Sequence, residues 1–404
     1  MPLAVLALAI SGFAIGVAEF VIAGLLPDIG SALSVSTPTA GLLVSGYAIG
    51  VVVGAPTLAF AARRMERRRL LIQLMALFLA GTVLSAIAPT YAVLMAGRIV
   101  SALAHGAFFG VAMVVAAGLV AEDKRGRAIS MIGAGLTLST VLGVPLGTLV
   151  GQHLGWRWAF WLVALCAAAG LAGIAALVPV SRPDTAADLR SEISVLRRPA
   201  VVLTLLTTVF GFGGVMTSYT YIADTMTRVT GFSAGAVTMI TMIFGLGMFA
   251  GNLVGGRLTD RRPTLALWGS LALLVAVLAV FTLTVHSKPA ACVTVFFFGA
   301  AAFATIPPLQ TRIMRQADGA PTLASASNIA AFNLANTAGP LLGGWVISAG
   351  FGYAALNGAA ALVSAVGLVL ALVTVAAGRA PARSRVTNAA PAVAPDNEPL
   401  SAQS

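Results

Sequence analysis

Charged residues are scarce in this chain of 404 residues. Asp, Glu, Lys and Arg make up 9% of it, whereas hydrophobic residues make up 59%. Soluble domains carry about 25% charged residues, so the composition excludes an ordinary water-soluble fold. The two cysteines, Cys166 and Cys292, both fall in long apolar segments. We therefore expect neither a disulfide nor a metal site, and we expect no cofactor.

Long segments without charge recur from one end of the chain to the other. A helix needs about 20 apolar residues to cross the hydrocarbon core of a membrane. A β-barrel is excluded because its strands alternate apolar and polar residues. The first segment lacks a basic region before it, so we expect a retained span and not a cleaved signal peptide. We predict twelve transmembrane helices, at residues 3–27, 40–60, 70–88, 92–118, 128–150, 159–180, 201–223, 233–254, 264–285, 290–311, 322–348 and 352–377.

The basic residues gather in alternate loops. If the N-terminus is cytoplasmic, 20 of the 24 Lys and Arg lie in the loops after even-numbered spans and in the C-terminal tail. Positive charge concentrates on the cytoplasmic side of membrane proteins. We therefore expect a multi-pass protein of the bacterial inner membrane with both termini in the cytoplasm. The net charge of +11 then serves orientation and contact with anionic lipid, and no nucleic-acid partner is expected.

Two segments of the chain repeat at a fixed distance. Pro145 lies between Gly143 and Gly147 in the fifth span, and Pro340 follows Gly339 in the eleventh, 195 residues further on (340 − 145). Gly143 and Gly147 stand four apart, on one face of a helix, where small residues let a neighbouring helix approach closely. The glycines and prolines could take part in conformational change or could only pack helices together.

This repeat predicts an all-α membrane protein of two pseudo-symmetric six-helix bundles. The first bundle covers residues 1–180 and the second residues 200–378. A polar stretch at 181–199 forms a cytoplasmic linker, and the tail at 379–404, rich in Ala, Pro and Ser, is expected to be disordered. Paired bundles of this kind hold the substrate near the membrane midplane, between the two halves.

Short motifs flank several of the spans. A GRLTDR stretch between the eighth and ninth spans contains Gly256, Asp260 and Arg261, a GWRWAF stretch precedes the sixth, and Arg98 lies near the start of the fourth. With these motifs the chain resembles the major facilitator superfamily over about residues 3–377. Within that superfamily it is similar to the drug:proton antiporters with twelve spans, especially the branch that resembles arabinose efflux permeases.

The chain also departs from the family pattern. In the first half the matching loop has Arg63 where the family usually has Asp, and the fifth span reads GVPLG instead of GPxxGG. The resemblance implies a secondary transporter that exports a drug or another lipophilic compound in exchange for protons by alternating access. It implies three kinds of partner, namely a small-molecule substrate, protons and the lipid bilayer, with a monomer as the default state.

Glu19 is the one carboxylate well inside a predicted span. A helix rises 1.5 Å per residue, so position in the sequence gives depth in the membrane. Arg98 and His105 in the fourth span lie at depths on either side of that of Glu19. Buried ionisable residues in membranes are costly and usually functional. We hypothesise that Glu19 carries the coupling proton and that Arg98 or His105 tunes it. Alternatively, Glu19 and Arg98 form a permanent ion pair between the first and fourth spans, and His105 only packs.

Shifting these three residues by 196 positions lands on Val215, Thr294 and Ala301, so the second half lacks the ionisable set. Proton chemistry is therefore assigned to the first bundle. The second bundle is expected to supply an apolar and aromatic wall to the substrate cavity. The candidate lining residues in the seventh and tenth spans are Phe212, Tyr219, Tyr221, Phe298 and Phe303.

Other classes of protein leave no signature in the chain. The sequence contains no HExxH, no paired Cys or His at metal spacing and no GxxxxGKS/T, so an enzyme is not expected. A receptor or scaffold would need a larger domain outside the membrane. A sugar or metabolite exporter of the same superfamily would look much the same as a drug exporter, and that alternative stays open.

Overall fold

The computed structural model describes residues 2–61, 65–121, 125–180, 197–316 and 321–379, and within them every regular element is a helix. The first half contains α1 (Leu3–Ala32), α2 (Thr37–Ala61), α3 (Arg67–Ala86), α4 (Tyr91–Gly118), α5 (Arg125–Leu138), the π turn η2 (Ser139–Gly143), α6 (Val144–Leu154) and α7 (Trp156–Leu177). The second half contains α9 (Pro199–Tyr219), α10 (Ile222–Arg228), α11 (Ala236–Arg261), α12 (Pro263–Thr284), α13 (Lys288–Ala304), α14 (Ile306–Gln316), α15 (Pro321–Ser348) and α16 (Ala355–Arg379).

These elements form the twelve predicted spans. The fifth span is built from α5, η2 and α6 in sequence, and the tenth from α13 and α14. Among the described residues, eleven helical segments are long and apolar enough to cross a membrane. The remaining span, α15, is 28 residues long and contains Asn328, Asn333 and Asn336, so it is the most amide-rich of the spans.

Proline and glycine account for several breaks between elements. Pro145 has no N–H group, so the carbonyl of Val141 loses its helical partner, and the chain forms the π turn just before this proline. The predicted helix at 290–311 is interrupted at Thr305, because the next turn begins with Pro307 and Pro308. Gly155, with φ of 99°, separates α6 from α7 in a backbone conformation that suits glycine.

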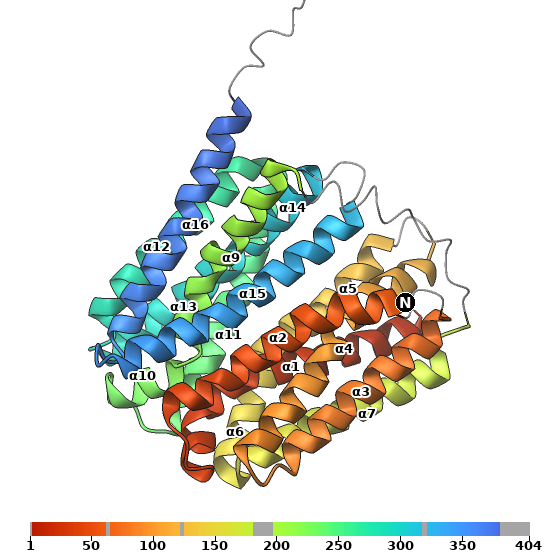
Figure 1. The fold of residues 1–404 in the computed structure, drawn as a ribbon, viewed down its shortest axis with the longest axis horizontal. Coiled ribbons are helices and arrows are strands. Elements are labelled where there is room, and N and C mark those ends of the chain that lie inside the picture. The colour runs from red at the N-terminus through yellow and green to blue at the C-terminus, as the bar shows by residue number, and fades with distance from the viewer. Residues whose placement is uncertain (1, 62–64, 122–124, 181–196, 317–320, 380–404) are drawn as a thin grey trace, which may run out of the picture.

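The helices form two bundles, one from each half of the chain (Figure 1). Each bundle has its own hydrophobic core. Phe20 and Ala23 of α1 and Val144 of α6 belong to the core of the second bundle, so the two cores meet along α1. The bundle boundaries at 1–180 and 200–378 remain predictions. Residues 181–196 of the predicted linker (181–199) and residues 380–404 of the predicted tail (379–404) lie outside the described residues.

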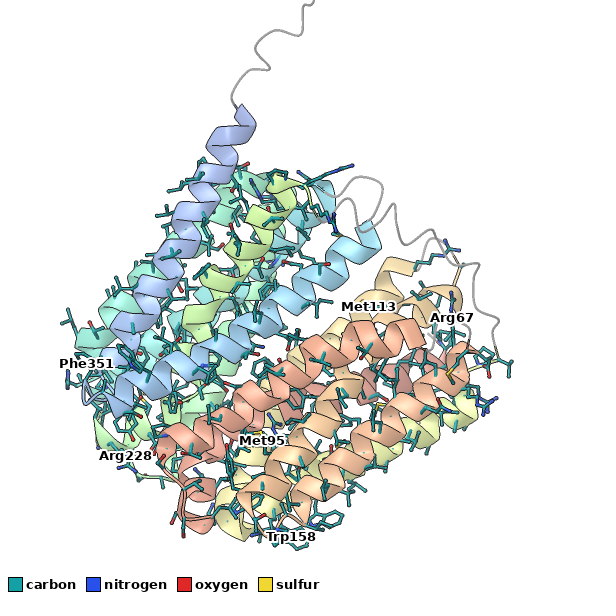
Figure 2. The ribbon with its side chains drawn as sticks, in the orientation of Figure 1. Arg67, Met95, Met113, Trp158, Arg228 and Phe351 are labelled. Atoms are coloured by element: carbon teal, nitrogen blue, oxygen red, sulfur yellow. The ribbon has the colours of Figure 1, made fainter. Side chains whose placement is uncertain are left out.

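We call the end of the molecule at which α1 and α15 end distal, and the opposite end proximal. Near the distal end, α2 and α15 lie side by side, and they separate toward the proximal end (Figure 1). Arg67, at the start of α3, and Arg228, at the end of α10, mark the proximal and distal ends (Figure 2).

The outer surface of the bundles is apolar. Leu165 of α7, Leu283 of α12 and Leu362 of α16 are 68%, 77% and 72% exposed. Apolar side chains exposed on many helices are favourable only where the surroundings are also apolar. The surface therefore fits the hydrocarbon core of a bilayer.

Candidate functional site

A small pocket lies between the two bundles at the level of Glu19. Its free volume of about 10 Å³ is the space of a single water molecule. Residues from α1, α2, α9 and α15 line it, so both bundles contribute, and they are Glu19, Phe20, Val44, Tyr47, Ala48, Met216 and Asn336. In this conformation the pocket is too small for an organic substrate.

Asn336 joins Glu19 across the bundle interface. Its Nδ2 donates a hydrogen bond to Oε1 of Glu19 at 3.2 Å. The Asn336 side chain is 6% exposed, and its Oδ1 is buried with no partner in the described part of the chain. Pro340, four residues further on, removes the N–H that would bind the backbone carbonyl of Asn336.

Arg98 is 1% exposed and ties three helices of the first bundle together. Its Nη1 donates to the carbonyl of Ala18 on α1, and its Nε donates to the carbonyl of Leu43 on α2 at 3.4 Å. The guanidinium carbon lies 4.2 Å from the centre of the Tyr47 ring, which is a cation–π distance. No guanidinium nitrogen of Arg98 lies within 4.0 Å of a carboxylate oxygen of Glu19, so these two described residues form no ion pair in this conformation.

His105 lies one hydrogen bond away from the same tyrosine. Its Nδ1 is 3.2 Å from the hydroxyl of Tyr47, and which of the two atoms donates depends on the histidine tautomer. The imidazole also packs against Phe109, with ring centres 5.3 Å apart. Tyr47 therefore connects Arg98, which packs on its ring, with His105, which contacts its hydroxyl.

The structure thus brings the predicted trio of Glu19, Arg98 and His105 into one polar cluster. Sequence reasoning missed two members of this cluster, Tyr47 and Asn336. The search for ionisable residues passed over both, because tyrosine and asparagine are neutral at ordinary pH. The three asparagines within the single span α15 were the available signal.

The predicted aromatic residues fall into different places. Tyr219 stacks on Phe244 with ring centres 4.2 Å apart and meets Phe20 of the first bundle edge-on at 6.4 Å. Tyr219 therefore lies at the bundle interface beside the Glu19 pocket. Phe212 and Phe303 have ring centres 6.4 Å apart, and Phe212 also packs against Phe332 of α15.

The other two aromatic residues lie away from the pocket. Phe298 is fully buried between Phe244 and Phe281, inside the second bundle. Tyr221 follows the end of α9, and its hydroxyl donates to the carbonyl of Pro340 at 2.8 Å. In this conformation Phe298 packs the core, and Tyr221 holds α9 against α15.

The glycines of the repeated segments lie against neighbouring helices. A Cβ on Gly143 would come within 2.2 Å of Val17 on α1, and one on Gly147 within 2.8 Å of Val21. A Cβ on Gly339 would come within 2.7 Å of Met216 on α9. Both segments therefore allow close helix packing within their own bundle.

The GRLTDR motif ends α11 at the proximal end of the second bundle. Asp260 and Arg261 are exposed there, and Gly256 has open space where a Cβ would stand. None of the motif's residues lines the Glu19 pocket.

Several contacts close the distal half of the bundle interface. Ser45 of α2 donates to the backbone carbonyl of Thr337 on α15 at 2.8 Å. Gln152 at the end of α6 donates to the carbonyl of Ala234 at 2.8 Å, and Thr238 donates back to Gln152 at 3.2 Å. These hydrogen bonds all join the first bundle to the second, and all lie between the midplane and the distal end.

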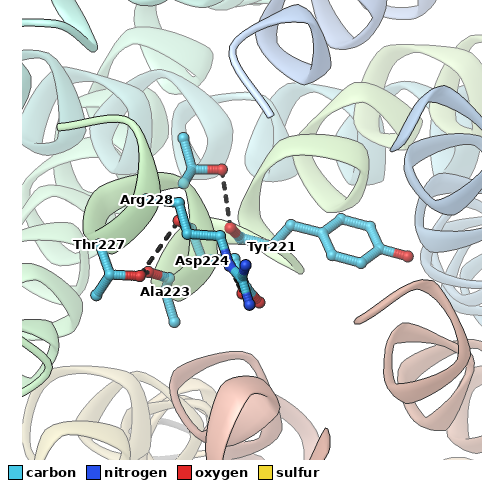
Figure 3. Close-up of polar contacts among 6 residues, drawn as sticks. Tyr221, Ala223, Asp224, Thr227 and Arg228 are labelled. Atoms are coloured by element: carbon cyan, nitrogen blue, oxygen red, sulfur yellow. Dashed lines mark hydrogen bonds and ion pairs between the residues drawn. The ribbon is translucent and has the colours of Figure 1, made fainter. Parts of the chain in front are cut away.

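A buried carboxylate lies at the distal end of the second bundle. Arg228 folds back over Asp224, with Nε 2.8 Å from Oδ1, while the ring of Tyr221 points away from both (Figure 3). Asp224 is 1% exposed in its side chain and its Oδ2 has no partner among the described residues. Burial raises the pKa of Asp224, and Arg228 opposes this shift. The hydrogen bond to Asp224 raises the pKa of Arg228.

The polar cluster around Glu19 can hold and release a proton but offers little else chemically. Within the described ranges no group of three or more His, Cys, Asp or Glu side chains could hold a metal ion. The carboxyl group of Glu19, the hydroxyl of Tyr47 and the imidazole of His105 are groups that can bind or release a proton, and Glu19 lines the pocket between the two bundles. A carboxyl group so placed can load or unload a proton as the bundles move.

Comparison with known proteins agrees with this architecture. The family model described as Major Facilitator Superfamily matches residues 8–331. The inner membrane transport protein YdhP of Escherichia coli (strain K12) is 42% identical over 383 residues, covering 95% of this chain and 98% of that protein. A chloramphenicol resistance protein of Streptomyces lividans is 39% identical over 399 residues, covering 97% and 99% of the two chains.

Solved structures share the fold at much lower identity. The crystal structure of a D-xylose-proton symporter superimposes with a TM-score of 0.73 and covers 92% of this chain and 96% of its own. Its sequence is 17% identical. This likeness concerns the fold alone.

Proposed function

Since the chain belongs to the Major Facilitator Superfamily, we propose that it exports a drug or another small lipophilic molecule from the bacterial cell in exchange for protons. The twelve spans and the inner-membrane relative support a multi-pass protein of the inner membrane. The similarity to a chloramphenicol resistance protein of Streptomyces lividans supports export of a toxic compound. The cargo crosses by alternating access, as the two bundles rock about the site between them.

The observation that carries the proposal is the position of Glu19. It is the carboxylate that lines the pocket between the bundles, and residues of both bundles surround it. A carboxylate held there by the amide of Asn336 can exchange its proton with one side of the membrane at a time. Glu19 is therefore the proton-carrying residue in this proposal, with Arg98 and His105 acting on it from α4 through Tyr47.

The orientation follows from the basic residues. With both termini in the cytoplasm, the proximal end faces the cytoplasm and the distal end faces the periplasm. The distal contacts from Ser45 and Gln152 then keep the periplasmic side closed. In this half of the cycle Glu19 releases its proton to the cytoplasm, and the pocket widens before it takes up cargo from there.

The test measures proton movement in inverted membrane vesicles that contain the protein. The vesicles are acidified inside by respiration, an acridine dye reports the pH gradient, and amphenicols, cationic dyes and pentoses are added in turn. Wild type is compared with Glu19→Gln. Glu398→Gln is the matched control, because it makes the same chemical change near the C-terminus.

Export in exchange for protons predicts that one compound class discharges the gradient in wild type and in Glu398→Gln but not in Glu19→Gln. A response only to pentoses would replace the lipophilic cargo by a sugar. An unchanged response in Glu19→Gln would remove Glu19 from proton coupling, and silence with every compound would contradict the export proposal.

A further inference from the structure

The hydrogen bond to the Glu19 carboxylate comes from the opposite bundle. Glu19 lies on α1, and the Nδ2 of Asn336 on α15 donates to it at 3.2 Å. Asn336 is 6% exposed, so water competes little for this contact. A hydrogen bond to a charged group is about twice as strong as one between neutral groups. The contact therefore holds the two bundles together most firmly while Glu19 is ionised.

The amide of Asn336 can also serve the protonated form of Glu19. A carboxylate only accepts hydrogen bonds, whereas a protonated carboxyl group carries one O–H donor. The Oδ1 of Asn336 is buried and has no partner among the described residues. The terminal torsion of asparagine is broad and roughly two-fold, so a half-turn of the amide presents this oxygen in place of the nitrogen.

The backbone of α15 is tied to the first bundle at the same point. The carbonyl of Thr337, the residue next to Asn336, accepts a hydrogen bond from Ser45 of α2 at 2.8 Å. Pro340 leaves the carbonyl of Asn336 without its helical N–H partner. This turn of α15 therefore combines a contact with α1, a contact with α2 and a weakened helical hydrogen-bond pattern.

We propose that Asn336 couples cargo export to proton entry by holding the empty, ionised transporter closed at the distal end. While Glu19 is ionised and no cargo is bound, the Nδ2 contact keeps α15 against α1. Protonation of Glu19 replaces the charge-assisted hydrogen bond from Asn336 by a weaker, neutral one. Bound cargo displaces the Asn336 amide from Glu19. The distal side therefore opens when the transporter carries a proton or cargo, and it stays closed when the transporter is empty.

This inference rests on the proposed function, because it assigns a partner to the proton-carrying residue. Its consequence is specific. If Asn336 cannot hold the ionised state, the empty transporter returns to the periplasmic side, and each cycle carries a proton inward without cargo. Loss of the amide therefore converts exchange into a proton leak that depends on Glu19.

The first experiment measures that leak in inverted vesicles without cargo. Asn336→Leu keeps the size of the side chain and removes both polar atoms. Losing a hydrogen bond to a charged group should accelerate the leak about tenfold or more over wild type. Asn333→Leu is the matched control on α15, because the Nδ2 of Asn333 donates to Ile329 in its own helix at 2.9 Å. Asn336→Gln retains an amide and should leak less than Asn336→Leu.

The double variant Glu19→Gln with Asn336→Leu should not leak, since no carboxyl group remains to carry the proton. A leak that persists in this double variant would overturn the proposal, because the protons would then bypass Glu19. A leak in Asn336→Leu no faster than in Asn333→Leu would overturn it as well.

The second experiment needs no transport. Spin labels are placed at Ala32 and Ser348, which are exposed at the distal ends of α1 and α15, in a chain whose two cysteines are replaced by alanine. In wild type the distal distance should stay short at alkaline pH, whereas Asn336→Leu should populate a longer distance there. Identical distances in the two proteins would contradict the role of Asn336. This measurement does not depend on cargo-induced proton movement. Failure of the role of Asn336 can therefore be distinguished from failure of the export proposal, which the vesicle assay with cargo tests.

Discussion

The ring of Tyr221 occupies the space that a side chain on Gly41 would need. A Cβ placed on Gly41 of α2 would lie 2.3 Å from the hydroxyl oxygen of Tyr221. That hydroxyl donates to Pro340, and the ring also lies against Gly343 on α15. Tyr221 is thus wedged between α2 and α15, at the distal end, and is fully buried there.

Gly41→Val should therefore prevent closure of the distal side. Real Cβ atoms do not come so close to another heavy atom, and both flanking helices limit how far the ring can shift. Spin labels at Ala32 and Ser348 should report a longer distal distance than in wild type. The second change Tyr221→Ala should restore the short distance in Gly41→Val. Gly110→Val is the control, because a Cβ on Gly110 meets nothing within 4 Å, and an effect of equal size there would contradict the wedge.

The stability of the protein should depend on the protonation of Asp224 at the distal end. Burial raises the pKa of Asp224 above the ordinary value of about 3.9. A carboxyl group whose pKa is raised in one state stabilises that state when protonated. The contribution of Asp224 to the stability of the folded state is therefore full below its ordinary pKa and is lost as the pH rises through the raised value.

The free energy of unfolding of purified wild type, measured across a series of pH values, should fall on the alkaline side of this window. Asp224→Asn is neutral at every pH and should remove the part of the pH dependence that falls in this window. Arg228 remains charged throughout, since the contact with Asp224 raises its pKa further. Superimposable pH profiles of wild type and Asp224→Asn would refute the assignment.

Arg98 should be important for stability as well as for the site. Arg98→Ala leaves a cavity beside Tyr47 and removes the side-chain donor to the carbonyls of Ala18 and Leu43. We expect a loss of about 3 kcal/mol or more in the free energy of unfolding of the purified protein. Arg98→Met restores much of the volume and should recover part of this loss. Arg315→Ala, at an exposed position of α14, should change stability little.

Two glycines two residues apart on α5 should respond oppositely to substitution. A Cβ on Gly135 would lie 2.3 Å from the backbone oxygen of Ala9 on α1, whereas one on Gly133 meets nothing within 4 Å. Gly135→Ala should destabilise the protein by about 1–3 kcal/mol through overpacking. Gly133→Ala should be neutral or stabilise by up to about 1 kcal/mol, because alanine favours the helix. Thermal unfolding in detergent measures both, and equal shifts would contradict the close approach of α1 and α5.

The twelve-helix fold could be predicted because charge is excluded from the membrane interior. Most long intervals between charged residues became one span and the interval from Asp318 to Arg379 became two, and the prediction of two six-helix bundles is confirmed. Hydropathy does not report whether a span is one continuous helix. The break at Thr305 and the π turn before Pro145 came from backbone groups that proline leaves without a partner.

The depth of Glu19, Arg98 and His105 could be estimated from helix geometry, because residue number fixes the rise along a straight span. The partners of these residues could not. The guanidinium of Arg98 is engaged by carbonyls of α1 and α2, and no sequence pattern marks a backbone carbonyl as an acceptor.

The aromatic residues illustrate a second limit. In a span that is apolar on every face, periodicity does not distinguish the side that faces the other bundle from the side that faces the bundle core. Tyr219 and Phe298 looked equivalent in the sequence, yet Tyr219 meets Phe20 across the interface and Phe298 packs between Phe244 and Phe281.

The π turn also sets the register of the glycines around it. Gly135 and Gly143 both face α1, although eight residues in a regular α-helix turn through about 800° and leave the two about 80° apart. A π turn accommodates one extra residue, so the effective separation is seven, and the mismatch falls to about 20°. The fifth span therefore has the form of a heptad spacing that has absorbed a one-residue insertion. Deleting one of residues 139–142 would keep both glycines against α1, whereas a deletion elsewhere between them would disturb the helical turn on one side.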